Sequence, residues 1–97
     1  MGVKHSREYV DILDELARAI SQVKEFYRFF QMETADWEQL SEDEQQGMTR
    51  TLADDLFYGL DHKPMLDVGC GSIKHDMENH VLIVSDGDQL IQIVNLV

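Results

Sequence analysis

Apolar residues between Tyr9 and Phe30 recur at alternating steps of four and three positions. This spacing places them on one side of a helix and leaves the opposite side polar, which predicts an amphipathic helix over residues 7–31. We expect this helix to be the element against which the rest of the chain packs. One row contains Tyr9, Leu13, Leu16, Ile20, Val23, Tyr27 and Phe30, and a neighbouring row contains Ile12, Ala19 and Phe26.

A second helix is predicted to begin just after Ser41. Ser41 and Glu44 have the spacing of a capping box, in which each side chain accepts a hydrogen bond from the other residue's backbone amide. The helix should cover residues 42–58. Before it, the segment 34–40 predicts a single helical turn whose Trp37 packs on the first helix. Because the connection is short, the two helices should form an antiparallel hairpin over about residues 6–60.

The pattern becomes extended after Pro64. Residues 65–68 and 73–75 predict a strand that is interrupted by glycines, and residues 81–84 predict the strongest strand of the chain. In residues 89–97, four apolar residues fall on one helical face, and Asp86 and Gln89 are spaced as a capping box, so we predict a short helix there. A third strand is the alternative, because Ile91 and Leu96 lie off that face.

These elements predict one α+β domain over residues 1–97. It would contain an antiparallel two-helix hairpin, a small antiparallel β-hairpin over about residues 64–97, and a short C-terminal helix at the end of that part. An isolated two-stranded hairpin is marginally stable in water and leaves its edges open. The hairpin should therefore lie on the helices or pair with a second copy of the chain, which predicts a homodimer.

The charge of the chain is strongly acidic and uneven. The net charge is −11 at pH 7, and within residues 31–60 the only basic residue is Arg50. This balance disfavours direct binding to nucleic acids and to anionic membranes. A solvated face is the usual role of such residues. The functional interpretation is an interaction face for a basic protein, and an acidic inhibitor that imitates a DNA backbone is a further alternative. The face would contain Glu33, Asp36, Glu38, Glu42, Asp43, Glu44, Asp54 and Asp55.

Other sequence features indicate a cytoplasmic protein. No apolar run approaches the length of a membrane-spanning helix, and residues 7–20 alternate charged and apolar types, unlike a signal peptide. The lone Cys70 cannot form an internal disulfide. Gly2 and Ser6 fit the loose pattern for N-myristoylation, but no polybasic segment follows to complete a membrane anchor.

The segment Leu66-Asp67-Val68-Gly69-Cys70-Gly71-Ser72 resembles the glycine-rich first loop of S-adenosylmethionine-dependent methyltransferases. The resemblance implies that Asp67, Gly69, Cys70 and Gly71 would contact a nucleotide-like cofactor, so a small enzyme or ligand-binding domain is the alternative function. In that family a long helix follows the loop, whereas residues 73–80 here are short and polar. Parallel strands also need a dozen or more connecting residues. We therefore interpret the glycines as a bulge or a close backbone approach and expect no cofactor.

The remaining chemistry-bearing residues do not form a recognised site. Cys70, His75 and His80 lie near one another in the sequence, but their spacing is not that of a zinc site. Cys70 could form a thiolate pair with a nearby histidine, but the sequence shows no third group that would orient that histidine. The adjacent Asp54 and Asp55 would not face each other on a helix. We therefore expect neither a metal site nor catalytic residues, and we predict a non-enzymatic interaction or regulatory module that binds a protein partner or itself.

Overall fold

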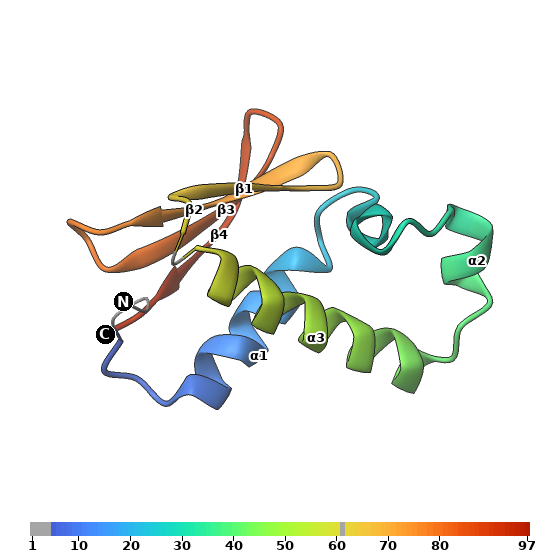
Figure 1. The fold of residues 1–97 in the computed structure, drawn as a ribbon, viewed down its shortest axis with the longest axis horizontal. Coiled ribbons are helices and arrows are strands. Elements are labelled where there is room, and N and C mark those ends of the chain that lie inside the picture. The colour runs from blue at the N-terminus through green and yellow to red at the C-terminus, as the bar shows by residue number, and fades with distance from the viewer. Residues whose placement is uncertain (1–4, 61) are drawn as a thin grey trace.

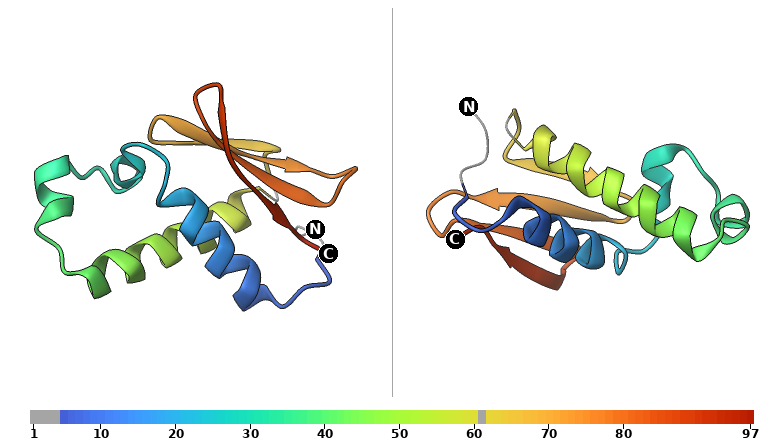
Figure 2. Two further views of the ribbon diagram at one scale, coloured as in Figure 1. Left: turned by 180° about the vertical axis from the view of Figure 1, so that it is seen from behind. Right: turned by 90° about the horizontal axis from the view of Figure 1, so that it is seen from below.

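A computed structural model describes residues 5–60 and 62–97 of the chain, so Gly2 of the myristoylation pattern lies outside it. The described part has three α-helices, one 3-10 helix and a four-stranded antiparallel sheet in the order β1-β2-β3-β4. Figures 1 and 2 show α1 and α3 on one face of this sheet. The elements are α1 (Tyr9–Ile20), η1 (Phe26–Phe30), α2 (Thr34–Glu38), α3 (Glu42–Gly59), β1 (Met65–Val68), β2 (Gly71–Asp76), β3 (Val81–Asp86) and β4 (Gln89–Asn95).

One hydrophobic core lies between α1, α3 and the inner face of the sheet. Alternate residues of the strands point into it, as the period of two along a strand requires. The helices contribute residues spaced at three and four, which lie on one helical face. The fully buried large side chains are Ile12, Leu16 and Ile20 of α1, Leu52 and Leu56 of α3, and Val68, Ile73, Leu82, Val84, Val94 and Leu96.

The helices α1 and α3 lie against each other and run in opposite directions. Near the start of α1, Tyr9 packs edge-on against Phe57, with 5.1 Å between ring centroids. Further along α1, Asp14 forms an ion pair with Arg50, which lies earlier in α3. The helices are nevertheless not the simple hairpin predicted, because α1 ends at Ile20 and the connection to α3 is long and contains η1 as well as the expected turn α2.

The prediction of a continuous helix over residues 7–31 is wrong. The helix ends at Ile20, and the chain then turns through Glu25, whose φ of 58° is left-handed, into η1. The apolar periodicity continues through this turn because Val23 and Phe26 are also buried. The segment after the break is held by a tertiary contact, in which the carbonyl of Lys24 accepts a hydrogen bond from the amide of Cys70 at 3.0 Å.

The predicted start of the second helix is confirmed. Ser41 precedes α3, and its Oγ accepts a hydrogen bond from the amide of Glu44 at 3.2 Å. The Glu44 carboxylate in turn accepts from the amide of Ser41 at 3.3 Å. The short helical turn around Trp37 is also present, as α2.

The predicted β-hairpin and C-terminal helix are wrong, because residues 65–95 form a four-stranded meander. The two glycines do not interrupt a strand: Gly69 and Cys70 form the turn between β1 and β2, where Val68 pairs with Gly71. Residues 89–95 form β4, which pairs with β3. A two-residue turn, Gly87-Asp88, joins those strands, and glycine at the first position of such a turn, here with a φ of 62°, is a common hairpin signal. The alternative prediction, a strand and not a helix in residues 89–97, is therefore the correct one.

The prediction of a homodimer depended on an isolated two-stranded hairpin, and the sheet has four strands. Four strands packed on two helices are a stable arrangement for a single chain. Self-association now needs a different physical reason.

Candidate functional site

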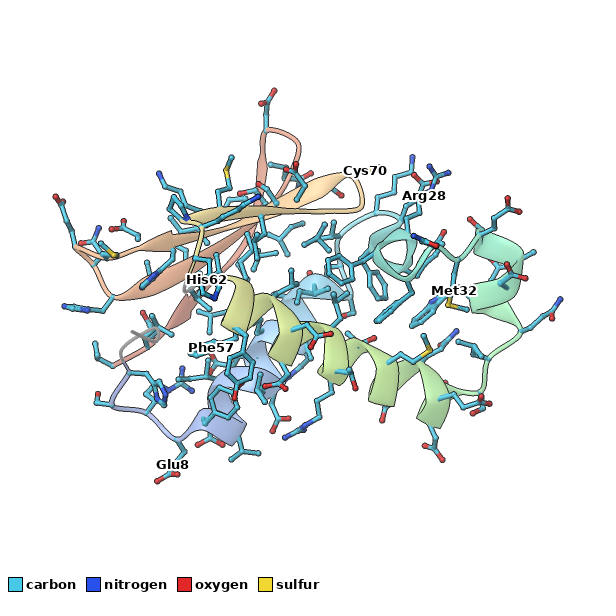
Figure 3. All side chains as sticks on the ribbon, in the orientation of Figure 1. Glu8, Arg28, Met32, Phe57, His62 and Cys70 are labelled. Carbon is cyan, nitrogen blue, oxygen red and sulfur yellow. The ribbon has the colours of Figure 1, made fainter. Side chains whose placement is uncertain are left out.

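The residues of the glycine-rich motif lie at the tip of the β1–β2 hairpin. A strand, and not a helix, follows the turn. Figure 3 shows Cys70 at this tip, near the segment that leads into η1. The long helix that follows the loop in the resembled family is therefore replaced by β2.

The space beside these glycines is filled by the protein's own backbone. A Cβ atom on Gly69 would lie 2.5 Å from the carbonyl oxygen of Glu25, and one on Gly71 would lie 2.2 Å from that of Ser85. Gly69 also has a φ of 55°, which glycine adopts without strain. The two glycines thus allow the hairpin to approach the segment after α1, which agrees with the close backbone approach predicted from the sequence.

Cys70 is exposed, but its surroundings do not activate it. Its thiol donates a hydrogen bond to the Glu25 carboxylate at 3.3 Å. This hydrogen bond raises the pKa of the Cys70 thiol above its ordinary value, with smaller contributions from desolvation and from the nearby negative charge of Glu25. A cysteine nucleophile needs the opposite shift, because the thiolate is the reactive form.

The three residues weighed as metal ligands are not brought together. Cys70 and His75 are five residues apart on one extended segment, which separates them by about 16 Å. His80 lies beyond the other end of β2, in the turn that leads to β3. Across residues 5–60 and 62–97, no group of three or more His, Cys, Asp or Glu side chains is arranged to hold a metal ion.

The predicted acidic face is divided into two places. Asp54 and Asp55 lie about 18 Å along α3 from its first turn, and Asp54 accepts a hydrogen bond from Tyr9. The other acidic residues lie on α2, on the first turn of α3 and just before α2, at the end of the molecule away from the sheet (Figure 1). We call this group the acidic tip; it consists of Glu33, Asp36, Glu38, Glu42, Asp43 and Glu44, all exposed.

An open groove of about 800 Å³ lies beside the acidic tip. One wall comes from the second half of α1, and the other comes from the first half of α3. Two acidic-tip residues, Glu42 and Asp43, form part of its rim. The lining comprises Asp14, Ala17, Arg18, Ser21, Phe26, Trp37, Glu42, Asp43, Gln45, Gln46, Gly47, Thr49 and Arg50.

Aromatic rings close one end of the groove. Trp37 stacks on Tyr27, with 5.6 Å between centroids and 8° between ring planes, and meets Phe26 edge-on at 5.1 Å. The side-chain amide of Gln45 donates to the carbonyl of Trp37 at 2.8 Å, and the hydroxyl groups of Tyr27 and Thr34 lie 2.6 Å apart. These contacts fix α2 against α3, so the half-buried indole of Trp37 has a defined position in the groove. The sequence predicts that Trp37 packs on the first helix, but it does not predict the groove. The groove forms only because the first helix ends at Ile20.

Both walls of the groove carry charges of both signs, with Asp14 and Arg18 on α1 and Glu42, Asp43 and Arg50 on α3. Arg18 and Arg50 lie along the α1–α3 contact, where Arg50 is paired with Asp14. None of the ion pairs among the described residues involves Glu42 or Asp43. Residues 29–49 contain no Lys, Arg or His, so their negative charge is not compensated within the segment.

A second depression of about 530 Å³ lies around the turn between η1 and α2. Figure 3 labels two of its lining residues, Arg28 and Met32, and Glu33 of the acidic tip also lines it. Arg28 is paired at 3.1 Å with Glu25, the same carboxylate that accepts the hydrogen bond of Cys70 in the β1–β2 turn.

Comparison of the chain with protein-family models, with curated proteins and with solved structures found no match. Among the helices of the part of the chain that the structure describes, none is long and apolar enough to cross a membrane.

Proposed function

We propose that the protein is a non-enzymatic interaction module that holds a basic segment of another protein in the groove between α1 and α3. The observation that carries this proposal is the combination of a half-buried tryptophan inside the groove with unpaired carboxylates on its rim. Trp37 would receive an apolar side chain of the partner, and Glu42 and Asp43 would receive its Lys or Arg side chains. Such a division, with an aromatic anchor and a charged rim, is common in protein interfaces.

The charge of the whole molecule supports the same class of partner. A net charge of −11 attracts basic proteins over a distance and repels nucleic acids. Arg18 and Arg50 lie near Asp14 and would repel a basic side chain. The part of the partner that faces α1 should therefore be acidic or neutral. The alternative of a DNA-mimicking inhibitor would need carboxylates spaced along an extended face, whereas Asp54 and Asp55 lie away from the acidic tip.

The proposal can be tested with the single tryptophan of the chain, since Trp37 is the only one. Its fluorescence would be followed while a soluble peptide of alternating Lys and Leu residues is added to the full chain, with a Glu and Leu peptide as the control. We expect saturable binding of the first peptide alone. Binding should weaken as salt is raised, because the rim charges are exposed.

A matched pair of variants locates the site. Asp43→Lys reverses a rim charge, and Asp55→Lys makes the same change on the same helix outside the groove. Asp43→Lys should weaken binding by about tenfold, the effect of a poorly matched rim charge, and Asp55→Lys should change it much less. Equal effects of the two variants, or no change in Trp37 fluorescence with the basic peptide, would show that the groove is not the binding site.

A further inference from the structure

The strand β4 forms one edge of the sheet and differs in composition from the rest of the chain. Charged residues make up 28% of the sequence, yet residues 89–97 contain no Asp, Glu, Lys or Arg, and no Pro. Natural edge strands usually carry charges, especially Lys, or proline, which prevent pairing with another strand. β4 lacks both, and of the other protective features of edge strands it has a register shift opposite Val84 and Ser85.

Along one edge, the backbone of β4 forms hydrogen bonds with β3, and its other edge faces outward. The amide of Leu96 donates to the carbonyl of His80 at 2.9 Å, on the β3 side. The carbonyl of Asn95 accepts from the Arg7 guanidinium at 2.9 Å, on the outer side. Because the sides alternate along an antiparallel strand, the backbone groups of Ile93 face outward as well.

Only the end of this outer edge is covered within the described residues. The Arg7 guanidinium binds the carbonyl of Asn95, and the amides of Ser6 and Arg7 bind the carbonyl of Leu96 just beyond β4. From Gln89 to Ile93, no described segment pairs with the outer edge. The apolar side chains along it are exposed: Leu90 to 55% and Ile93 to 46%. An edge with open backbone groups and exposed apolar side chains is a template for another strand.

We propose that β4 pairs with β4 of a second copy of this chain in an antiparallel arrangement, which joins the two sheets into one. A basic partner would find no carboxylate on this strand. A second copy, which is repelled elsewhere by its net charge of −11, meets an uncharged surface here. A symmetric dimer also needs a self-complementary patch, and an antiparallel pair of identical strands satisfies that condition.

The charges at the two ends of β4 disfavour the parallel direction. Asp88 lies in the turn before β4, and Arg7, which is paired with Glu15, lies at its other end, on Asn95. Antiparallel pairing brings Asp88 of one copy to the end that carries Arg7 of the other. Parallel pairing would place the two Asp88 side chains on the same end, where like charges are unfavourable.

The test is the oligomeric state of the full chain, measured by sedimentation equilibrium from about 1 to about 200 µM, because association depends on concentration. We expect a monomer–dimer equilibrium. Ile93→Lys puts a charge on the edge and should weaken dimerisation by about tenfold or more. Met77→Lys is the matched control, since it makes the same charge change at an exposed site in the β2–β3 turn, and it should leave the dimerisation constant within about twofold. A chain that stays monomeric over this range, or equal weakening by both variants, would overturn the proposal.

A second variant keeps the test decisive if Ile93→Lys does not fold. Asp88→Lys changes an exposed turn residue and would place Lys beside Arg7 of the other copy. We expect it to weaken the dimer, with a smaller effect at high salt. Amide hydrogen exchange gives an independent measure, because the Ile93 amide should be protected in the dimer and should exchange rapidly on dilution. An unchanged dimer in Asp88→Lys, or an Ile93 amide that is unprotected in the dimer, would exclude antiparallel pairing through β4.

Discussion

Gly69 lies so close to the carbonyl group of Glu25 that a methyl group would not fit between them, since a Cβ atom would be 2.5 Å from the oxygen. This contact joins the β1–β2 turn to the segment after α1. It explains why glycine stands at position 69, and it lies in the segment where the apolar pattern continues although the helix has ended at Ile20. The motif that resembled a cofactor loop is used here for packing of backbone against backbone.

Gly69→Ala should therefore destabilise the protein by more than about 2 kcal/mol, because it adds a backbone clash to a left-handed conformation. Gly47→Ala is the control, since a Cβ there meets nothing within 4 Å. As a helix-interior change from Gly to Ala, it should stabilise the protein by about 0.5–1 kcal/mol. Urea unfolding of the two variants measures both effects. Similar stabilities for the two variants would contradict the close approach at Gly69.

Cys70 should react slowly with alkylating reagents at neutral pH despite its exposure. The Glu25 carboxylate raises the thiol pKa by accepting its hydrogen bond, so the thiolate is scarce. Glu25→Gln removes the negative charge and should increase the alkylation rate severalfold. Glu78→Gln, a change at an exposed turn residue, should leave the rate unchanged. The rate is measured with iodoacetamide on the folded protein, and fast alkylation of the unaltered chain would contradict the structure.

The capping box at the start of α3 should contribute to stability through both of its residues. Ser41→Ala removes the acceptor for the Glu44 amide and should cost about 1 kcal/mol. Glu44→Ala removes the reciprocal bond to the Ser41 amide. Because each residue caps the other, the double variant should lose less than the sum of the two single losses. Additive losses in thermal or urea unfolding would show that the two bonds act independently.

The ion pair between Arg7 and Glu15 should make stability depend on pH. The Arg7 guanidinium, 2.7 Å from Glu15, lowers the pKa of this carboxyl below its usual value of about 4.5. A lowered folded-state pKa contributes stability that is fully present above the unfolded pKa and is lost as pH falls through the folded pKa. Glu15→Gln should therefore reduce the loss of stability below about pH 4.5. An unchanged acid-unfolding profile in this variant would show that the pair is too weak to matter, as many exposed pairs are.

The sequence alone determined the elements that local interactions specify. The capping box placed the start of the second helix within one residue, because both of its hydrogen bonds form between residues three apart. The apolar periodicity of the first segment identified residues that are buried, including Ile12, Leu16 and Ile20. It could not locate the end of the helix, because Val23 and Phe26 continue the pattern and are buried from a different backbone conformation.

Tertiary structure decided the rest. Residues 89–95 have enough apolar positions for either a helix or a strand, and β3 settled the choice because it offers them unpaired backbone groups on its open side. The groove beside Trp37 likewise arises only when η1 and α2 fold back against α3. The physical reason is the same in both cases: backbone hydrogen bonds and packing surfaces from distant parts of the chain outweigh local preferences that differ by a fraction of a kilocalorie per residue.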